Sequence, residues 1–361
     1  MRAAVLETIP GKVVVDDVAI DLPGPREVLI RTAAAGVCHS DLHFIDGLYR
    51  HPVPLVPGHE SAGVVEAVGD QVSYVAPGDH VITCLSVFCG TCEFCLSGRP
   101  ALCPKRDLRR PSGATPRLRG GDDAINQFLD LSSFAEQMLV HENALVKIRP
   151  DMPLDRAALL GCGVTTGLGA VFRTAKVEPG QTVAVIGCGG IGLSCIQGAI
   201  LAGATRVIAV DLLPAKLDVA RQFGATDLVN AGDADPVAVV QELTAGGVDH
   251  AFEAIGLGRT AEQAFAMARR GGTATIIGMI PPEENVVLPG AAFLGEKRIQ
   301  GSLMGSNRFR VDMPRYVELY LQGRLKLGEM VSARIELEGL NDAFQALRDG
   351  AVTRTLVTFP G

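Results

Sequence analysis

Four cysteines stand close together in the chain, at Cys89, Cys92, Cys95 and Cys103. Their spacing places four thiols in one short loop, and four thiolates complete the tetrahedral shell of a zinc ion. Because the protein would fill every coordination position, we expect this zinc to be structural. Two disulfides or an iron-sulfur cluster are also compatible with the spacing, so both alternatives stay open here.

A glycine-rich turn follows an apolar run at residues 182–186 and precedes a helix-like segment at 191–202. In such a strand-turn-helix unit the first glycine makes a tight turn, the second lets the backbone approach a pyrophosphate, and the third lets the helix pack on the strand. The helix N-terminus then faces the phosphates. The predicted cofactor-binding residues of this turn are Gly187, Gly189, Gly190, Ile191 and Gly192.

Asp211 ends the next apolar run, at residues 206–211. A carboxylate at this distance from the turn can accept hydrogen bonds from the adenine-side ribose and repels a 2′-phosphate. The sequence therefore predicts a site that prefers NAD to NADP.

Three further residues have the chemistry of metal ligands, namely Cys38, His59 and Cys162. An isolated cysteine is usually a small buried hydrophobe, and an isolated histidine is more often hydrogen-bonded than a ligand. Spacing cannot join residues a hundred positions apart, so the residues alone do not make these three a site.

The composition is that of a globular protein with more than one core. The 361 residues suggest two domains, and a net charge of −7 argues against a broad nucleic-acid or acidic-membrane footprint. The first residues contain no apolar run of signal-peptide length, which favours the cytoplasm. Residues 179–205 carry no charge and are long enough to span a bilayer, but glycines interrupt them, so we expect a strand and a helix there.

The order of elements predicts an α/β fold. Short Val-rich and Ile-rich runs such as 27–31, 63–68 and 80–83 make the first third β-rich. From about residue 163 strands alternate with helices, at 206–211, 214–223, 249–254, 260–270 and 273–279, which indicates a doubly wound parallel sheet. After a strand at 299–304, the last segment mixes a helix at 314–321 with strands at 333–337 and 355–358 and is expected to rejoin the first domain.

Several motifs together resemble the zinc-containing alcohol dehydrogenases of the medium-chain dehydrogenase family. They are Cys38-His39-Ser40-Asp41, Gly58-His59-Glu60, the four-cysteine loop and the run from Gly161 to Gly167. The resemblance covers nearly the whole chain. It implies a Rossmann sheet at 164–301 and a β-rich, GroES-like catalytic domain built from 1–163 and 302–361.

The resemblance also implies a second, catalytic zinc on Cys38, His59 and Cys162. Two thiolates and an imidazole leave one tetrahedral position open, where a metal can lower the pKa of an alcohol. By the same resemblance Asp41 orients His59 and Glu60 approaches the metal. Ser40 and His43 would pass the substrate proton to solvent.

Further cofactor contacts are implied by position in the family. Lys216 resembles a lysine at the adenine-side ribose, and His39 takes a place often held by an arginine that binds the pyrophosphate. The remaining implied contacts to the nicotinamide half or the pyrophosphate are Thr166, Ile255, Ile277 and Arg354.

The residues that align with the substrate channel are mostly apolar, which favours a primary aliphatic or aromatic alcohol, or its aldehyde. They are Tyr49, Leu85, Leu108, Phe128, Leu129, Met279 and Leu303. The glutathione-dependent formaldehyde dehydrogenase branch is the alternative. That branch has two acids and an arginine where this chain has Tyr49, His51 and Asp107, although Arg106, Arg109 and Arg110 lie nearby.

A non-catalytic NAD-binding zinc protein is the alternative of another class, and it would be expected to have a damaged site. Here every implied ligand and relay residue is present. The long segment between Cys103 and Phe134 resembles that of dimeric relatives, so we expect a homodimer built across the cofactor domains.

Overall fold

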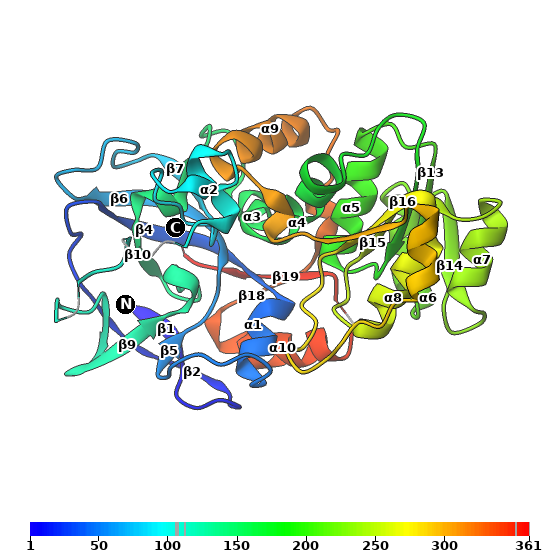
Figure 1. Cartoon of the computed structure of the whole chain (residues 1–361). Coiled ribbons are helices and arrows are strands. Elements are labelled where there is room, and N and C mark those ends of the chain that lie inside the picture. The colour runs from blue at the N-terminus through cyan, green and yellow to red at the C-terminus, as the bar shows by residue number, and fades with distance from the viewer. Residues whose placement is uncertain (105–107, 112, 351, 361) are drawn as a thin grey trace. The chain divides into compact units, whose positions relative to one another are not determined.

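The computed structural model describes residues 1–104, 108–111, 113–350 and 352–360. The chain divides into two units (Figure 1), one comprising Met1–Cys162 with Arg308–Gly361 and the other comprising Gly163–Asn307. The sequence analysis places the second border at residue 301. The structure keeps the turn η8 (Met304–Ser306) in the second unit because it packs on α4 (Gly163–Gly169), where Gly169 and Gly305 meet backbone to backbone.

The first unit is β-rich. Its strands are β1 (Arg2–Leu6), β2 (Val13–Asp17), β3 (Ala19–Ile20), β4 (Glu27–Val37), β5 (Leu55–Val56), β6 (Glu60–Val68), β7 (His80–Thr83), β8 (Leu118–Gly120), β9 (Asp123–Gln127), β10 (Gln137–His141), β11 (Leu145–Lys147), β18 (Val331–Ile335) and β19 (Arg354–Thr358). Within the described residues they form two mainly antiparallel sheets, ordered β2-β1-β5-β9-β8-β3 and β11-β7-β6-β4-β19-β18, with β10 beside β4. The pairing of β19 with β4 returns the C-terminal segment to this unit.

Short helices connect these strands. They are α1 (His39–Ile45), α2 (Glu93–Leu96), α3 (Leu154–Ala158), α9 (Phe309–Leu321) and α10 (Leu340–Arg348), with the single turns η1 (Pro100–Leu102), η3 (Phe128–Asp130), η4 (Glu142–Ala144), η5 (Leu159–Gly161), η9 (Gly328–Met330) and η10 (Leu337–Gly339). The prediction that the helix near residue 314 begins at its proline is wrong. Helix α9 begins at Phe309, because the Asp312 carboxylate accepts the Arg308 N–H and caps the first turn.

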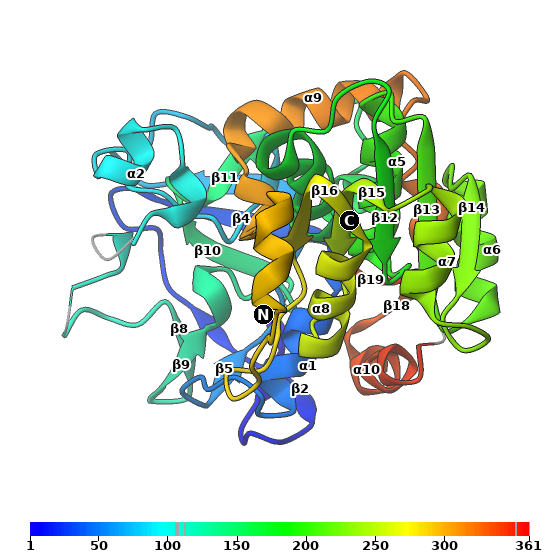
Figure 2. The same cartoon turned by 45° about the vertical axis from the view of Figure 1, so that its right-hand side comes forward.

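The second unit is a doubly wound sheet, as predicted. Its elements are α4, η6 (Ala170–Ala175), β12 (Thr182–Ile186), α5 (Gly190–Leu201), β13 (Arg206–Asp211), α6 (Pro214–Gln222), β14 (Asp227–Asn230), α7 (Pro236–Leu243), β15 (Val248–Glu253), α8 (Gly258–Met267), β16 (Ala268–Ile276), η7 (Gly290–Gly295), β17 (Arg298–Gly301) and η8. The order is β14-β13-β12-β15-β16-β17, with every neighbouring pair parallel. Figure 2 shows β12, β13 and β14 side by side.

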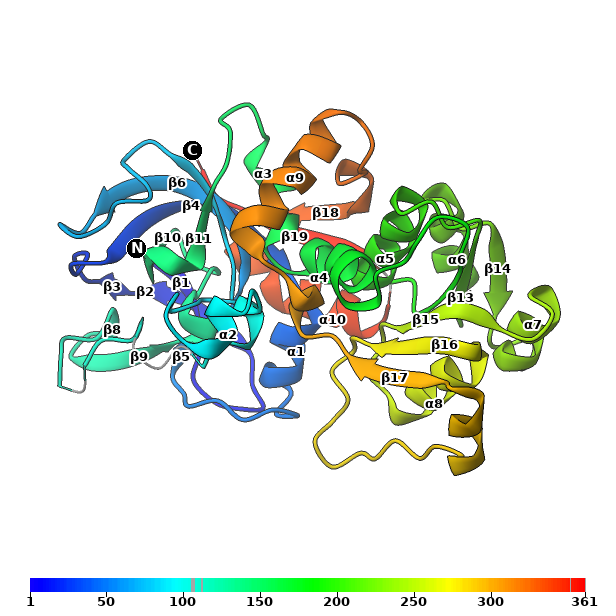
Figure 3. The ribbon, with the colours of Figure 1, turned by 45° about the horizontal axis from the view of Figure 1, so that its top comes forward.

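The direction of winding reverses between β12 and β15, which are neighbours in the sheet. Helices α5 and α6 cover one face and α8 covers the other (Figure 3), as right-handed crossovers require. In this kind of sheet ligands bind beyond the carboxyl ends of the strands at the reversal. The residues that follow β12, β13, β15 and β16 are therefore the place to look for the cofactor.

The uncharged stretch at 179–205 divides into strand β12 and helix α5. In the described part of the chain no single helix is long and apolar enough to cross a membrane. One bent pair, Leu154–Gly161 with Gly163–Ala175, passes that test of length and composition, with a bend of 55°.

Candidate active site and metal centres

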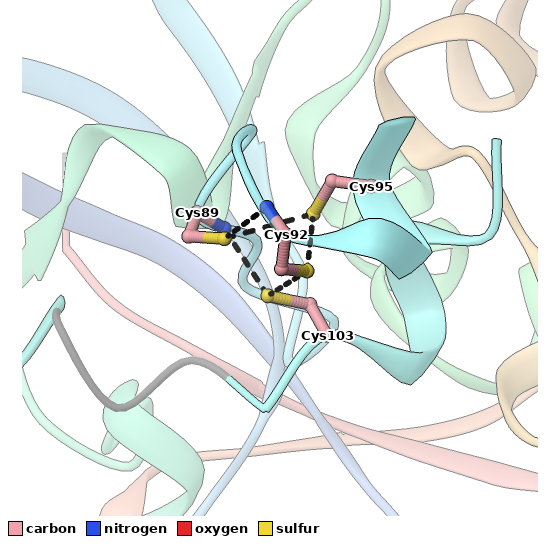
Figure 4. Close-up of side chains that lie close together, drawn as sticks. All are labelled: Cys89, Cys92, Cys95 and Cys103. Carbon is pink, nitrogen blue, oxygen red and sulfur yellow. Dashed lines mark hydrogen bonds between the residues drawn. The ribbon is translucent and has the colours of Figure 1, made fainter. Parts of the chain in front are cut away.

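The four-cysteine loop brings its sulfur atoms together (Figure 4). The Sγ atoms of Cys92 and Cys95 lie 3.5 Å apart, those of Cys92 and Cys103 3.8 Å, and those of Cys89 and Cys95 3.9 Å. These distances match the edge of a tetrahedron, about 3.8 Å, that four bonds of about 2.3 Å to one zinc ion produce. The loop therefore fits a structural zinc.

The alternatives for this loop do not fit. A disulfide needs sulfur atoms about 2.05 Å apart, and every cysteine of the chain is a thiol in the structure. A four-iron cluster holds each of its four cysteines on a different iron and therefore needs sulfur atoms further apart than these, and a two-iron cluster separates its cysteines into two pairs on different irons. Backbone N–H groups of Cys89 and Cys92 donate to sulfur atoms of the loop, which favours thiolates. A hydrogen bond from Thr91 lowers the pKa of the Cys89 thiol to about 6.

The second cluster joins three distant parts of the first unit. Cys38 caps the start of α1, His59 directly precedes β6, and Cys162 follows the turn η5. Their ligand atoms all lie within 4.8 Å of one another, and no side chain of the three is more than 4% exposed. The imidazole Nε2 of His59 lies 3.3 Å from the Cys162 Sγ, so this nitrogen faces the cluster. Two sulfurs and one nitrogen fit a zinc ion with one open position.

Glycines allow this convergence. Gly58, beside His59, has a φ of +93°, and a Cβ there would lie 2.6 Å from the Phe134 nitrogen. A Cβ at Gly161, beside Cys162, would lie 3.0 Å from the Ser61 nitrogen and the Thr83 oxygen. In the sequence both glycines stand out only as parts of motifs. Their packing role becomes visible once the strands are paired.

Asp41 orients the cluster from the first turn of α1. Its Oδ1 lies 2.9 Å from His59 Nδ1 and accepts the Gly58 N–H at 3.1 Å, while its Oδ2 accepts the Cys38 N–H at 3.1 Å. Burial opposes a charged imidazole, but the Asp41 carboxylate raises the pKa of His59 above its usual value. A carboxylate on Nδ1 fixes the ring so that Nε2 points to the metal position.

The two thiols of the cluster share a hydrogen bond. A hydrogen bond with Cys162 lowers the pKa of the Cys38 thiol, and the same contact raises the pKa of Cys162. Glu60 and Arg354 are buried beside them, with Arg354 Nη2 3.9 Å from Glu60 Oε2. Burial opposes the guanidinium charge, but Glu60, Cys38 and Cys162 together raise the pKa of Arg354. The cluster thus contains a fixed positive charge that balances its anionic groups.

The proposed proton-relay residues lie on α1. Ser40 is half-buried, and His39 at the start of the helix is exposed. Nδ1 of His43 is buried and has no hydrogen-bond partner among the residues described. Burial lowers the pKa of His43, so the ring is neutral near pH 7 and can accept a proton.

The glycine-rich turn has the shape that a pyrophosphate needs. A Cβ at Gly192 would lie 1.7 Å from the Gly187 oxygen, while at Gly189 it would meet nothing within 4 Å. Helix α5 begins at Gly190 and continues through Ile191. Close packing at Gly192 and open space at Gly189 therefore fit a phosphate at the helix N-terminus.

Asp211 lies at the carboxyl end of β13, beside this turn. Its Oδ2 accepts the Cys188 N–H at 2.7 Å and its Oδ1 accepts the Leu213 N–H at 3.0 Å. Lys216 lies in the first turn of α6 and is half-exposed. The other cofactor candidates of the second unit are Thr166, which is 5% exposed, Ile277, which is 9% exposed, and Ile255, which is 43% exposed.

The aligned substrate residues divide between the units. Met279 and Leu303 belong to the second unit. In the first unit Phe128 is fully buried in a core cluster, against which Leu129 packs, and Leu85 and Leu108 pack on a neighbouring cluster. Tyr49 is half-buried and stacks on His43 at 6.3 Å between ring centroids.

The residues that bear on the glutathione alternative lie partly outside the described residues, since Arg106 and Asp107 are not among them. Arg110 contacts Asp21 and Glu27 at 2.5 Å and is only 19% exposed. Arg109 is 73% exposed and pairs with Asp130 at 3.0 Å.

Aromatic side chains near the metal cluster were not all anticipated. Phe44 packs edge-on against Phe128 at 4.9 Å, and Phe128 in turn packs against the His59 ring at 5.8 Å. His51 contacts both phenylalanines. The position of Phe44 on α1, one residue after His43, was the available signal, but a lone phenylalanine in a helix is usually core.

Comparison with known proteins agrees with both halves of this description. The family described as alcohol dehydrogenase GroES-like domain matches residues 24–150, and that described as zinc-binding dehydrogenase matches residues 190–321. An S-(hydroxymethyl)glutathione dehydrogenase of Haemophilus influenzae is 39% identical over 99% of this chain and 97% of its own.

Solved structures are similar over the whole chain. A benzyl alcohol dehydrogenase of Acinetobacter calcoaceticus superposes with a TM-score of 0.94 at 32% identity, covering 99% of both chains. A zinc-binding dehydrogenase of Sinorhizobium meliloti, bound to NADP, gives a TM-score of 0.83 at 30% identity, again over 99% of both. With two clusters that fit zinc and a dinucleotide turn, this chain belongs to the zinc-containing alcohol dehydrogenases of the medium-chain dehydrogenase family, oxidoreductases that use a nicotinamide nucleotide.

Proposed function

We propose that this enzyme oxidises primary alcohols with an apolar, preferably aromatic, substituent, or reduces the matching aldehydes, with NAD. The observation that carries the proposal is the set of aromatic side chains around the metal cluster of the first unit. Phe44 connects Tyr49, at 5.6 Å, with Phe128, which packs on the ligand His59. Aromatic rings attract one another in stacked and edge-on arrangements and favour an apolar substrate over a charged one.

The catalytic zinc supplies an electrophile that makes the alcohol proton more acidic, and NAD supplies the hydride acceptor. Residues of the chain orient the metal ligands and balance the charge of the cluster. Asp41 holds His59 with Nε2 toward the metal position. Arg354 and Glu60 supply buried charges beside the cluster.

The proton leaves through α1 in our proposal. Ser40 accepts it from the substrate side, and the neutral His43 receives it at Nδ1, the buried nitrogen that lacks a partner within the described residues. A general base works best when it is neutral and within reach at the working pH. The stack of His43 on Tyr49 keeps the ring in place.

The proposed preference for NAD rests on Asp211. The carboxylate stands at the end of β13, where a 2′-phosphate would meet a like charge. We further propose that Lys216 contacts the same ribose, that His39 and Arg354 act at the pyrophosphate, and that Thr166, Ile255 and Ile277 contact the nicotinamide half.

The glutathione adduct of formaldehyde is the second candidate, because the relative from Haemophilus influenzae is named for it. That substrate is anionic and needs cations that are available to bind it. Arg110 is committed to Asp21 and Glu27, and Tyr49 and His51 stand where the related branch has acids. These features favour the apolar alcohol.

The test is the rate of NADH formation with benzyl alcohol, hexanol, ethanol and S-(hydroxymethyl)glutathione, each with NAD and with NADP. We expect kcat/KM for benzyl alcohol with NAD to be at least about tenfold above that for the glutathione adduct, a difference of about 1.4 kcal/mol in barrier. Tyr49→Ala should lower the ratio of kcat/KM for benzyl alcohol to kcat/KM for ethanol, and because it also removes the stack on His43, it should lower the rates with both alcohols. A higher kcat/KM for the glutathione adduct would overturn the proposal.

We propose a homodimer that forms at β17, the edge of the parallel sheet. An open edge strand offers unpaired backbone groups, and large apolar side chains lie exposed nearby, with Leu294 85%, Val287 72% and Leu303 56% exposed. Light scattering should give twice the chain mass, and Leu294→Glu should yield monomers. A monomeric wild-type protein would contradict this.

Because every cysteine is a thiol, the cytoplasm is the compartment we propose.

A further inference from the structure

The second unit contains a buried acid at the end of a central strand of its sheet. Glu253 is the last residue of β15 and is fully buried. It pairs in register with Ile186 at the end of β12 and with Ile276 at the end of β16. Glu253 therefore lies at the reversal of the sheet, where the cofactor is expected.

One oxygen of this carboxyl group collects three donors. Oε1 accepts the Ile255 N–H at 2.9 Å and the Gly256 N–H at 2.7 Å, and it lies 2.8 Å from the Thr260 Oγ1. The first two donors belong to the loop that follows β15, and Thr260 lies in the first turn of α8. A buried carboxyl group is expensive unless it is hydrogen-bonded, so this one fixes the loop rather than merely filling space.

The other oxygen faces a second loop. Oε2 has no hydrogen-bond partner among the described residues, and a Cβ built on Gly278 would lie 2.7 Å from it. The same Cβ would lie 2.1 Å from the Gly256 nitrogen. The loops after β15 and β16 thus interlock around Glu253 with no room for a side chain at position 278.

The loop held by Glu253 touches the phosphate-binding turn. A Cβ at Gly187 would lie 2.6 Å from Ile255 Cγ1, yet the Ile255 side chain is 43% exposed. Ile255 therefore packs against the first glycine of the turn and still presents apolar surface to a ligand. Its conformation depends on Gly256, whose φ is +100°.

The polarity of the bound dinucleotide follows from Asp211. The adenosine half would lie toward β13, which carries that acid, and the N-terminus of α5 would hold the pyrophosphate. The other half must continue past the reversal toward β15 and β16. The loop at 254–257 is therefore on the nicotinamide side.

We propose that Glu253 is a positioning residue that holds the loop 254–257 in the shape that receives the nicotinamide half of the cofactor. The inference rests on the proposed use of NAD. Without the carboxyl group, two backbone N–H groups lose their acceptor, and Ile255 is no longer fixed against Gly187. The Thr260 hydroxyl keeps only the Leu257 carbonyl oxygen, at 2.9 Å.

The experiment compares Glu253→Ala with Glu253→Gln, which keeps one oxygen for the three donors. Kd is measured by calorimetry for NADH and for ADP-ribose, a probe without the nicotinamide. We expect Glu253→Ala to weaken NADH binding at least about tenfold and to leave ADP-ribose within about twofold, whereas Glu253→Gln stays within about threefold for both.

Glu262→Ala is the matched control, because Glu262 also accepts a backbone N–H, that of Val287 at 2.8 Å, from further along α8. It should lower thermal stability without changing the Kd of NADH. If Glu253→Ala does not fold, Thr260→Val decides, with an expected loss of about threefold for NADH alone.

Unchanged NADH affinity in the folded variant, or an equal loss for NADH and ADP-ribose, would overturn the proposal. Because the measurement uses no alcohol, failure of the substrate proposal does not affect it. A wild-type protein that prefers NADPH to NADH would instead contradict the proposed cofactor.

Discussion

The two metal centres of the first unit are built in opposite ways. The four-cysteine loop takes all its ligands from one short segment, and three of them are half-exposed. The second centre takes Cys38, His59 and Cys162 from three separate elements and buries them all. The first offers four ligands and can only hold its loop together, whereas the second offers three ligands and is buried away from water, where a charge has most effect.

The largest expected effect is the loss of chemistry at the buried centre. His59→Ala should lower kcat/KM for benzyl alcohol at least about a thousandfold, because a metal electrophile is worth several kcal/mol and each 1.4 kcal/mol is tenfold. NADH binding should persist, since the dinucleotide turn belongs to the other unit. Steady-state kinetics and calorimetry measure the two. A variant that keeps a tenth of the wild-type rate would remove His59 from the catalytic ligands.

Cys92→Ser should act on stability instead. Three thiols hold zinc poorly, so the loop should lose its ion and the protein should lose about 2 kcal/mol or more, which lowers Tm by roughly 4–8 °C. Turnover per folded chain should stay within about twofold of the wild type, because this ion touches no substrate. Differential scanning calorimetry and initial rates report both quantities. Loss of turnover with an unchanged Tm would reverse the roles of the two centres.

Asp41→Asn tests the support of the buried centre. Both carboxylate oxygens of Asp41 accept hydrogen bonds, so an amide must turn its NH₂ toward the N–H of Cys38 or toward the groups at Gly58 and His59. Such a partner of a ligating histidine is worth about 10–100-fold in metal affinity or activity. Zinc affinity from competition with a chelator, together with kcat, measures the effect. Cys92→Ser is the control. It leaves Asp41 and the buried centre unchanged, so the buried centre of this variant should bind zinc as in the wild type.

The last prediction leaves the catalytic rate untouched and concerns acid stability around the segment that follows the four-cysteine loop. Glu27 is buried, and although burial opposes its charge, Arg110 and Arg117 lower its pKa from 4.5 to about 2. The stabilisation is complete above the unfolded pKa of about 4.5 and is lost as the pH falls through about 2, a contribution of roughly 3 kcal/mol at neutral pH.

Glu27→Gln should therefore flatten the dependence of the unfolding free energy on pH between about 4.5 and 2. Urea unfolding at several pH values gives this slope. A slope equal to that of the wild type would show that other carboxylates carry the acid sensitivity. Glu66→Gln serves as the control, since Glu66 is a third exposed and lies 3.7 Å from Arg31.

The difference between the centres also explains what the sequence could predict. The four cysteines lie so close in the chain that spacing alone points to one ion, and the sulfur distances agree. Cys38, His59 and Cys162 meet only through strand pairing and close approaches at Gly58 and Gly161, which spacing does not encode. The family resemblance, and not periodicity, predicted that these three residues form one site.

The parallel sheet was predictable from alternation, because its strands are continuous apolar runs between helices. Glu253 was not, since a glutamate at the end of an apolar run is usually solvent-exposed. Its burial becomes evident only when the neighbouring strand β16 is in place, because Gly278, two residues after Ile276, brings the following loop against the Glu253 carboxyl group. The resemblance implies Arg354 only as a cofactor contact, and its place beside the metal cluster becomes evident once β19 pairs with β4.

The most direct test of two distinct zinc centres is the zinc content per chain of freshly purified wild-type protein, His59→Ala and Cys92→Ser, measured together with turnover and Tm. We expect two ions in the wild type and one in each variant, with turnover lost only in His59→Ala and Tm lowered chiefly in Cys92→Ser. A single zinc in the wild type, or two variants that lose turnover and stability alike, would contradict it.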